Sequence, residues 1–178
     1  MKTMTQIKPA GIGSISHGTL RTEDLISAFA DELEWQINRN GEYFSQPEHF
    51  AFRDKLNNLV SEAKDAWNED GETLRDEESA SEMVNELQDV LSNNFAPMYG
   101  YFGSHEGDGS DFGYWVNIDT VKEDVGFVSS ESQEFPDDDF LGAWLRVNER
   151  GNCVLYVREV AGAGSDDNYQ DEEIWSLV

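Results

Sequence analysis

Apolar residues between positions 22 and 96 recur every three or four residues, the spacing that places them on one face of an α-helix. The first run begins at Thr22, a preferred N-cap residue that two acidic residues follow, and Gly41 ends it. Pro47 suits the opening of the second run, whose apolar stripe reaches Trp67, and Pro97 closes the helical half. The pattern predicts three amphipathic helices, over residues 22–40, 47–67 and 76–93.

Beyond position 98 the pattern changes to short segments, rich in β-branched and aromatic residues, in which alternate positions are apolar. A Gly-containing turn, Glu149–Asn152, lies between two of these segments and predicts a β-hairpin. The expected fold class is α+β, with three amphipathic helices followed by a four- to five-stranded antiparallel sheet. The predicted strands are residues 112–118, 125–129, 141–148 and 153–160, with 174–178 as a fifth at the sheet edge.

The length of 178 residues suggests a single domain over residues 1–178, with two small lobes as the alternative. Within it we expect an N-terminal arm (1–21), a helical part (22–96) and a β-rich part (98–178). The arm has three basic residues and no acidic one, and its Gly, Ser and Thr content indicates a frayed or extended segment.

Three further features point to a cytoplasmic protein without a membrane partner. No apolar run approaches the roughly 18 residues of a membrane-spanning helix. The N-terminus lacks the apolar core of a secretory signal. Cys153 is the single cysteine, which excludes an internal disulfide and fits a reducing compartment.

The net charge of the chain narrows its possible partners more than any sequence motif does. The chain has 12 basic and 37 acidic residues, a formal net charge of −25, yet its 12% aromatic content favours a packed core over an acidic disordered tail. Residues 62–89 and 104–139 together carry −19 of that charge. Solubility alone needs a net charge of only about 2–8 in magnitude. Such a surface repels phosphate, so we expect a basic protein partner and no direct nucleic-acid binding.

The segment 99–115 concentrates the candidate chemistry, because it sets His105, Glu106, Asp108 and Asp111 among five glycines. Three interpretations remain open: a glycine-rich turn capped by Asx side chains, a cation site, or a general base at His105 beside Asp108. The spacing does not meet the EF-hand pattern, and no nucleophile, phosphate-loop or dinucleotide motif is present. We therefore expect no catalytic residue, no metal and no cofactor, with a metal-assisted enzyme centred on residues 105–111 as an alternative.

Two kinds of adaptation produce such an acidic composition: adaptation to high salt, and imitation of the charge of nucleic acid. Duplex DNA carries one charge per about 1.7 Å of axis, and carboxylates at similar spacing can engage the same Arg and Lys side chains. Acidic residues on the polar face of the third helix and in the later turns are the expected partner-binding surface. These candidates are Asp76, Glu78, Glu82, Glu86, Asp89, Asp108, Asp111, Asp137, Asp138 and Asp139.

Four segments carry a resemblance to known proteins: GIGSISHGTLRTEDLISAFADELEW (11–35), FGSHEGDGSDFGYW (102–115), VNERGNCVLYVREV (147–160) and EEIWSLV (172–178). They resemble a group of small acidic proteins carried by plasmids, phages and related mobile elements. In character the chain is similar to anti-restriction and anti-CRISPR proteins that imitate DNA. The resemblance implies a role against a host protein and assigns no catalytic residue.

The expected function is therefore a non-enzymatic acidic inhibitor from a mobile element, acting in the host cytoplasm. It would block the DNA- or RNA-binding groove of a basic host defence or DNA-processing protein. The alternatives are the metal-assisted enzyme and a halophilic housekeeping protein, which would fold only in molar salt.

Overall fold

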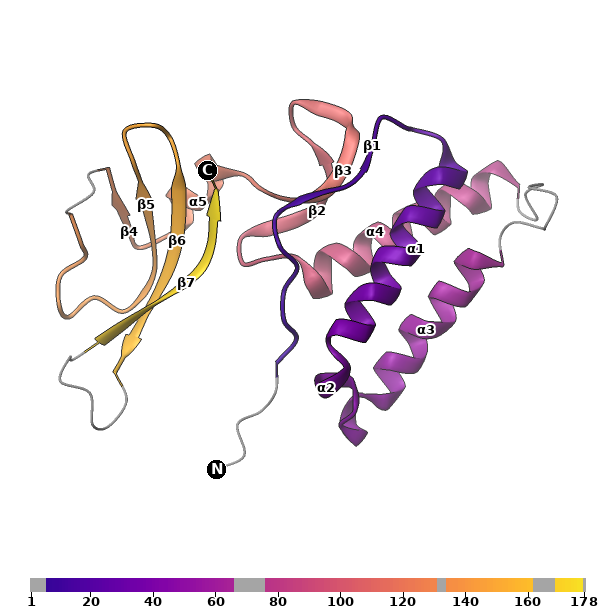
Figure 1. Cartoon of the computed structure of the whole chain (residues 1–178), viewed down its shortest axis with the longest axis horizontal. Helices are drawn as coiled ribbons and strands as arrows, with labels where there is room; N and C mark the ends of the chain where they lie inside the picture. Colours follow the sequence, from indigo (N-terminus) through magenta and orange to yellow (C-terminus); the bar gives the residue numbers. More distant parts are fainter. Residues whose placement is uncertain (1–5, 66–75, 131–133, 162–168, 178) are drawn as a thin grey trace. The chain divides into compact units, whose positions relative to one another are not determined.

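The computed structural model describes residues 6–65, 76–130, 134–161 and 169–177 and shows an α+β protein (Figure 1). Trp67 and the acidic residues between positions 66 and 75 lie outside the described residues. The chain forms two compact units. The first comprises Met1–Ala96 and Gly100–Trp115, and the second comprises Pro97–Tyr99 and Val116–Val178.

The three predicted helices are present in the first unit as α1 (Thr22–Arg39), α3 (Phe50–Lys64) and α4 (Glu77–Phe95). Two short elements, α2 (Gly41–Phe44) and the 3-10 helix η1 (Pro47–His49), join α1 to α3. Pro47 therefore opens a 3-10 turn rather than the long helix itself. The N-cap prediction at Thr22 was wrong, because the helix already includes Thr22 and Arg21 holds the cap position.

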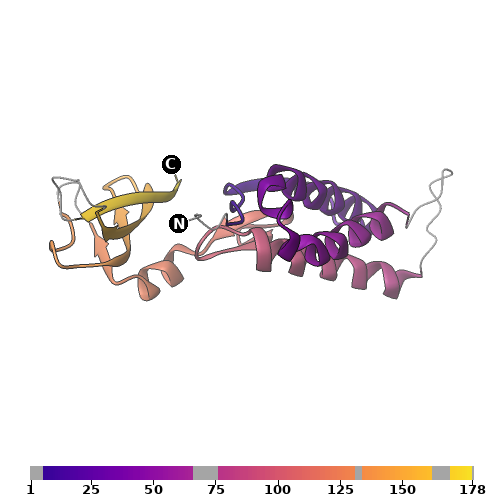
Figure 2. The ribbon, with the colours of Figure 1, turned by 90° about the horizontal axis from the view of Figure 1, so that it is seen from below.

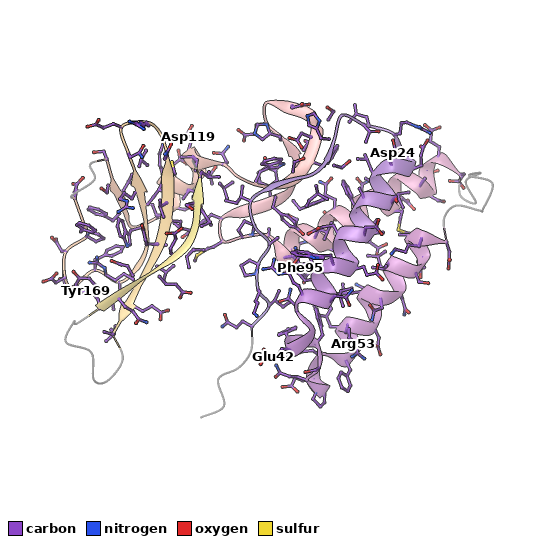
Figure 3. All side chains as sticks on the ribbon, in the orientation of Figure 1. Asp24, Glu42, Arg53, Phe95, Asp119 and Tyr169 are labelled. Carbon is purple, nitrogen blue, oxygen red and sulfur yellow. The ribbon has the colours of Figure 1, made fainter. Side chains whose placement is uncertain are left out.

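The core of this unit lies where α1 packs against both α3 and α4, which lie side by side with it in Figures 1 and 2. Phe29, Leu33 and Leu91 are fully buried there. Phe95, labelled in Figure 3, ends α4 and is also fully buried. The apolar stripes read from the helical period are thus the packed faces of these helices.

A small antiparallel sheet of order β1-β3-β2 belongs to the same unit: β1 (Gly13–His17), β2 (Gly100–His105) and β3 (Asp108–Val116). The segment expected to be a frayed arm contains β1, which pairs with β3. Gly113 permits this pairing, because a Cβ there would lie 2.1 Å from the carbonyl oxygen of Gly13. Phe102 fixes the sheet on the helices, with its ring centroid 4.9 Å from that of Phe29.

The second unit contains a four-stranded sheet of order β4-β5-β6-β7. The hairpin predicted around Glu149–Asn152 is confirmed, since β5 and β6 pair antiparallel from Gly142↔Arg158 to Val147↔Cys153. The expectation of a wholly antiparallel sheet was wrong, because β4 pairs parallel with β5. The strands are β4 (Phe127–Ser129), β5 (Gly142–Val147), β6 (Cys153–Val160) and β7 (Tyr169–Leu177).

One helix of the second unit was not predicted. The strand expected over 112–118 ends at Val116, and α5 (Ile118–Asp124) follows, capped by the Asn117 side chain, which accepts a hydrogen bond from the backbone N–H of Thr120 (3.0 Å). With β1 before the helices and α5 among the strands, the predicted order of helices and then one sheet holds only in part. No helix among the described residues combines the length and apolarity that crossing a lipid bilayer requires.

Candidate functional site

Four acidic side chains form a continuous ridge along α4. Glu78, Glu82, Glu86 and Asp89 are exposed, and at 100° per residue they fall within an arc of about 80°, opposite the buried Leu87. Their Cα atoms span about 16 Å of helix, over which one strand of B-DNA presents about five phosphates. We call these four residues the α4 ridge.

The α4 ridge is not neutralised within the described part of the chain, where none of its four carboxylates forms an ion pair. Lys64 of α3 pairs instead with Asp31 and Glu34 of α1, at 3.1 and 2.6 Å. The ridge thus keeps its charge available to an external partner.

A groove of about 590 Å³ runs between α3 and α4 beside the ridge. Glu82, Glu86 and Asp89 line one wall, and Lys55 of α3 lines the other without forming an ion pair to a described residue. Carboxamide groups of α4, including that of Asn93, complete the lining. The groove therefore offers hydrogen-bond acceptors and donors along a mainly negative wall.

Asp76, the first residue of the predicted acidic surface, has a structural role. It is the N-cap of α4, and its carboxylate accepts a hydrogen bond from the backbone N–H of Ser79 (2.8 Å). Hydrogen bonds from the backbone N–H and the side chain of Ser79 lower the pKa of Asp76, so the cap stays ionised. The cap fixes the point at which α4, and with it the ridge, begins.

The glycine-rich segment folds as a hairpin between β2 and β3, with a two-residue turn at Glu106 and Gly107. His105 accepts a hydrogen bond from the backbone N–H of Gly107 (3.1 Å), and its ring packs edge-on against Trp115 at 4.7 Å. Asp108 accepts hydrogen bonds from the N–H and the hydroxyl of Ser110 (3.0 and 2.8 Å), which lower its pKa. Of the three interpretations of this segment, the observed geometry matches the glycine-rich turn capped by Asx side chains.

The pairing of His105 with Asp108 considered above is not found. The imidazole near Asp108 belongs to His17 of β1, with Nε2 3.5 Å from Oδ2, and both side chains are largely exposed. Asp111 is also tied to β1, because it accepts a hydrogen bond from the Ser14 hydroxyl. Within the described part of the chain, no three His, Cys, Asp or Glu side chains lie close enough together to hold a metal ion.

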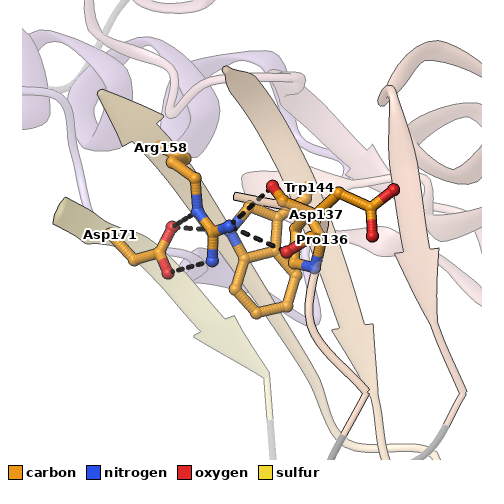
Figure 4. A network of polar contacts seen from close by, with 5 residues as sticks. All are labelled: Pro136, Asp137, Trp144, Arg158 and Asp171. Atoms are coloured by element: carbon orange, nitrogen blue, oxygen red, sulfur yellow. Dashed lines mark hydrogen bonds and ion pairs between the residues drawn. The ribbon is translucent and has the colours of Figure 1, made fainter. Parts of the chain in front are cut away.

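The acidic triplet Asp137, Asp138 and Asp139 lies in the second unit and is exposed. The segment that carries it is held by Arg158 of β6, a side chain that is only 1% exposed (Figure 4). Arg158 Nη1 donates to the carbonyl oxygens of Pro136 (2.9 Å) and Asp137 (3.2 Å). Two backbone anchors thus position the start of the triplet.

A bidentate ion pair compensates the buried charge of Arg158. Its Nε and Nη2 donate to the two carboxylate oxygens of Asp171 (2.9 and 2.8 Å), and the ring of Tyr169 lies 3.8 Å from the guanidinium carbon. Trp144 Nε1 donates to the same carboxylate (3.0 Å). These donors, Arg158 first, lower the pKa of Asp171.

The ten predicted surface residues therefore fall into groups with different roles. Seven lie in the first unit, where Glu78, Glu82, Glu86 and Asp89 form one ridge, while Asp76 caps α4 and the two hairpin acids bond to neighbouring side chains. Sequence reasoning missed Lys55, His17 and Arg158. For Arg158 the sequence did offer a signal, because an arginine stands inside the apolar strand predicted over 153–160.

Comparisons of this chain with protein-family models, with curated proteins and with solved structures gave no match.

Proposed function

We propose that this protein is a non-enzymatic inhibitor that imitates the charge of nucleic acid and occupies the nucleic-acid-binding groove of a basic partner. The observation that carries the proposal is the α4 ridge, four exposed carboxylates in line without an ion pair to a described residue. The resemblance described above supports a mobile-element origin and a host defence or DNA-processing target of the anti-restriction or anti-CRISPR type. Its site of action would then be the host cytoplasm.

Spacing favours this interpretation of the ridge. Successive members three or four residues apart are separated by about 4.5–6 Å along the axis, close enough to engage a row of Arg and Lys side chains arranged for phosphates. A carboxylate offers an Arg side chain the same two-oxygen acceptor geometry that phosphate does.

Rigidity favours it as well. Glu82 and Glu86 are neighbours on the helix, where like charges repel and destabilise it by about 0.2–0.5 kcal/mol per pair. The buried stripe that includes Leu87 and Leu91, both fully buried, holds the helix in place despite that repulsion. A partner therefore meets a charge array that is already ordered, and little conformational entropy is lost on binding.

The test removes two ridge charges with the Glu82→Gln/Glu86→Gln variant. Tagged parent protein is used to isolate its partner from host lysate, and the partner's binding to a labelled DNA duplex is then measured against increasing inhibitor. We expect the parent to displace the duplex, and the variant to need about tenfold more protein. Its affinity should also fall less steeply with salt, because fewer charges are engaged.

The matched control is Glu42→Gln/Glu48→Gln, which removes the same charge from exposed positions of the first unit away from the ridge. It should inhibit as the parent does. The proposal fails if the isolated partner binds duplex and inhibitor together, or if the ridge variant inhibits as strongly as the control at every salt concentration.

A further inference from the structure

A second hollow in the first unit, of about 360 Å³, lies apart from the α4 ridge, between the N-terminal segment, α1 and β3. Its polar lining comes from Glu32 and Gln36 of α1 and from Tyr114 of β3. Ile15 and Trp35, which are 37% and 53% exposed, line it with apolar surface. We call this hollow the Gln36 pocket.

Two buried polar atoms of this pocket lack hydrogen-bond partners among the described residues: Gln36 Oε1 and the Tyr114 hydroxyl. The two side chains are 0% and 1% exposed. Gln36 Nε2 donates to the Glu32 carboxylate (2.7 Å), which fixes the amide so that Oε1 is the free acceptor. Because buried polar atoms in proteins are almost always paired, two orphans in one pocket point to a ligand that supplies donors.

The electrostatics of the pocket indicates the charge that such a ligand would carry. Glu32 is half-buried and forms no ion pair with a described residue. Burial raises its pKa, and the Gln36 and Tyr114 side chains and the charge of nearby Arg39 oppose that rise only in part. The Tyr114 hydroxyl lies near this carboxylate and near the Gln36 side chain, although neither contact has hydrogen-bond geometry. Burial first, and then the charge of Glu32, raise the pKa of Tyr114 far above its usual value. The pocket thus presents a half-buried carboxyl group and an uncharged hydroxyl, and a cationic donor would favour the ionised form of that carboxyl.

We propose that the Gln36 pocket binds the guanidinium group of an arginine side chain from the partner protein. A guanidinium has five N–H donors in a plane, enough to reach the carboxylate, the amide oxygen and the hydroxyl at once. Arg39 of this chain already lies over Trp35 at the rim, 4.9 Å from the ring centroid, so the polar lining, and not that ring face, would hold the incoming guanidinium. A lysine ammonium is a compact, strongly hydrated charge and fits this lining less well.

This inference rests on the proposed function only in taking the partner to be basic. The pocket would add a specific anchor to the distributed attraction of the α4 ridge. Charge along a helix steers and attracts, whereas one desolvated pocket filled by one side chain contributes selectivity among basic partners.

The experiment titrates the 178-residue chain with N-acetyl-arginine methylamide and, as the matched ligand, N-acetyl-lysine methylamide, and follows side-chain and backbone NMR signals. We expect the arginine probe to shift the signals of Gln36, Glu32 and Tyr114 at millimolar concentration, and the lysine probe to bind several-fold more weakly. Tyr114→Phe and Glu32→Gln should each weaken arginine binding about fivefold or more.

Thermal stability separates a binding role from a structural one. Tyr114→Phe removes an unpartnered hydroxyl and keeps the ring, so its melting temperature should equal or exceed that of the parent. Should Glu32→Gln fail to fold, Tyr114→Phe alone decides. The inference is wrong if the arginine probe shifts none of these signals, if the lysine probe binds as well, or if Tyr114→Phe binds arginine like the parent.

The ridge variant Glu82→Gln/Glu86→Gln distinguishes this failure from failure of the proposed function. It leaves the Gln36 pocket intact, so it should bind the arginine probe as the parent does. A ridge variant that binds the arginine probe and still competes with DNA as the parent does contradicts the charge-imitation proposal alone. A parent protein that competes with DNA but does not bind the arginine probe contradicts the pocket proposal alone.

Discussion

Arg158 shows how one buried charge organises the second unit. Its guanidinium is satisfied by the Asp171 carboxylate, two backbone carbonyls and the ring of Tyr169. Removing one member of a buried pair leaves the other charge desolvated and unpaired, which costs about 3–5 kcal/mol. Arg158→Met should therefore lower the free energy of unfolding by about that amount, as measured by urea denaturation.

Two controls accompany this prediction. Arg146→Met removes a half-buried arginine of the same sheet, whose Nη2 donates to the Tyr156 hydroxyl, and should cost much less. Arg158→Met combined with Asp171→Leu should recover part of the loss, because no uncompensated charge remains. If Arg158→Met is as mild as Arg146→Met, the buried pair does not stabilise this unit.

The pH dependence follows from the same pair. The pKa of Asp171 is lowered in the folded protein. The contribution of the pair to the free energy of unfolding is therefore complete above the unfolded pKa of about 3.9. It is lost as the pH falls from about 4 through the lower folded value, where protonation breaks the pair. In Asp171→Asn the acid side of the stability curve should therefore be flatter than in the parent.

At the scale of elements, β1 depends on one glycine in its neighbour. A Cβ at Gly113 would meet the Gly13 carbonyl oxygen at 2.1 Å and Ser14 Cα at 2.8 Å, and both are backbone atoms. We expect Gly113→Ala to separate β1 from β3 and to cost about 1–3 kcal/mol, the usual range for overpacking. Hydrogen exchange of the amides of Ser14–His17 should accelerate.

Gly109→Ala is the matched control, since Gly109 lies in the same strand and a Cβ there meets nothing within 4 Å. Equal stability of the two variants would mean that β1 does not approach β3 as closely as the structure shows.

At the scale of the whole molecule, the net charge of −25 determines how stability responds to salt. The Debye length falls from about 30 Å at 0.01 M to about 8 Å at 0.15 M, so salt screens repulsion among the carboxylates. We expect the protein to be folded at 0.01 M salt and its melting temperature to rise toward 0.15 M. Circular dichroism melts across that range test both points.

A variant of lower charge provides the comparison. Glu82→Gln/Glu86→Gln should be slightly more stable than the parent at low salt and should gain less from added salt. A chain that folds only in molar salt would contradict this prediction and favour the halophilic alternative.

Several features of this protein were determined by the sequence alone. The 3.6-residue period identified α1, α3 and α4, because side chains three or four positions apart share a face whatever packs against it. Asp76 and the turn at Glu149–Asn152 likewise mark the start of α4 and the β5–β6 hairpin through local backbone chemistry. The exposure of the α4 ridge followed from the same period, whereas its role as a nucleic-acid mimic stays a prediction.

Tertiary structure decided the rest, because it depends on contacts between residues far apart in the chain. The pairing of β1 with β3 needs the close approach at Gly113, and the parallel pairing of β4 with β5 leaves no local signal. Arg158 is buried because Asp171, the backbone of residues 136–137 and the rings of Trp144 and Tyr169 enclose its guanidinium, and the strand pattern gives no sign of those contacts. The Gln36 pocket arises where a helix and a strand 78 positions apart set Gln36 beside Tyr114, and a period of 3.6 or 2 holds no information about that juxtaposition.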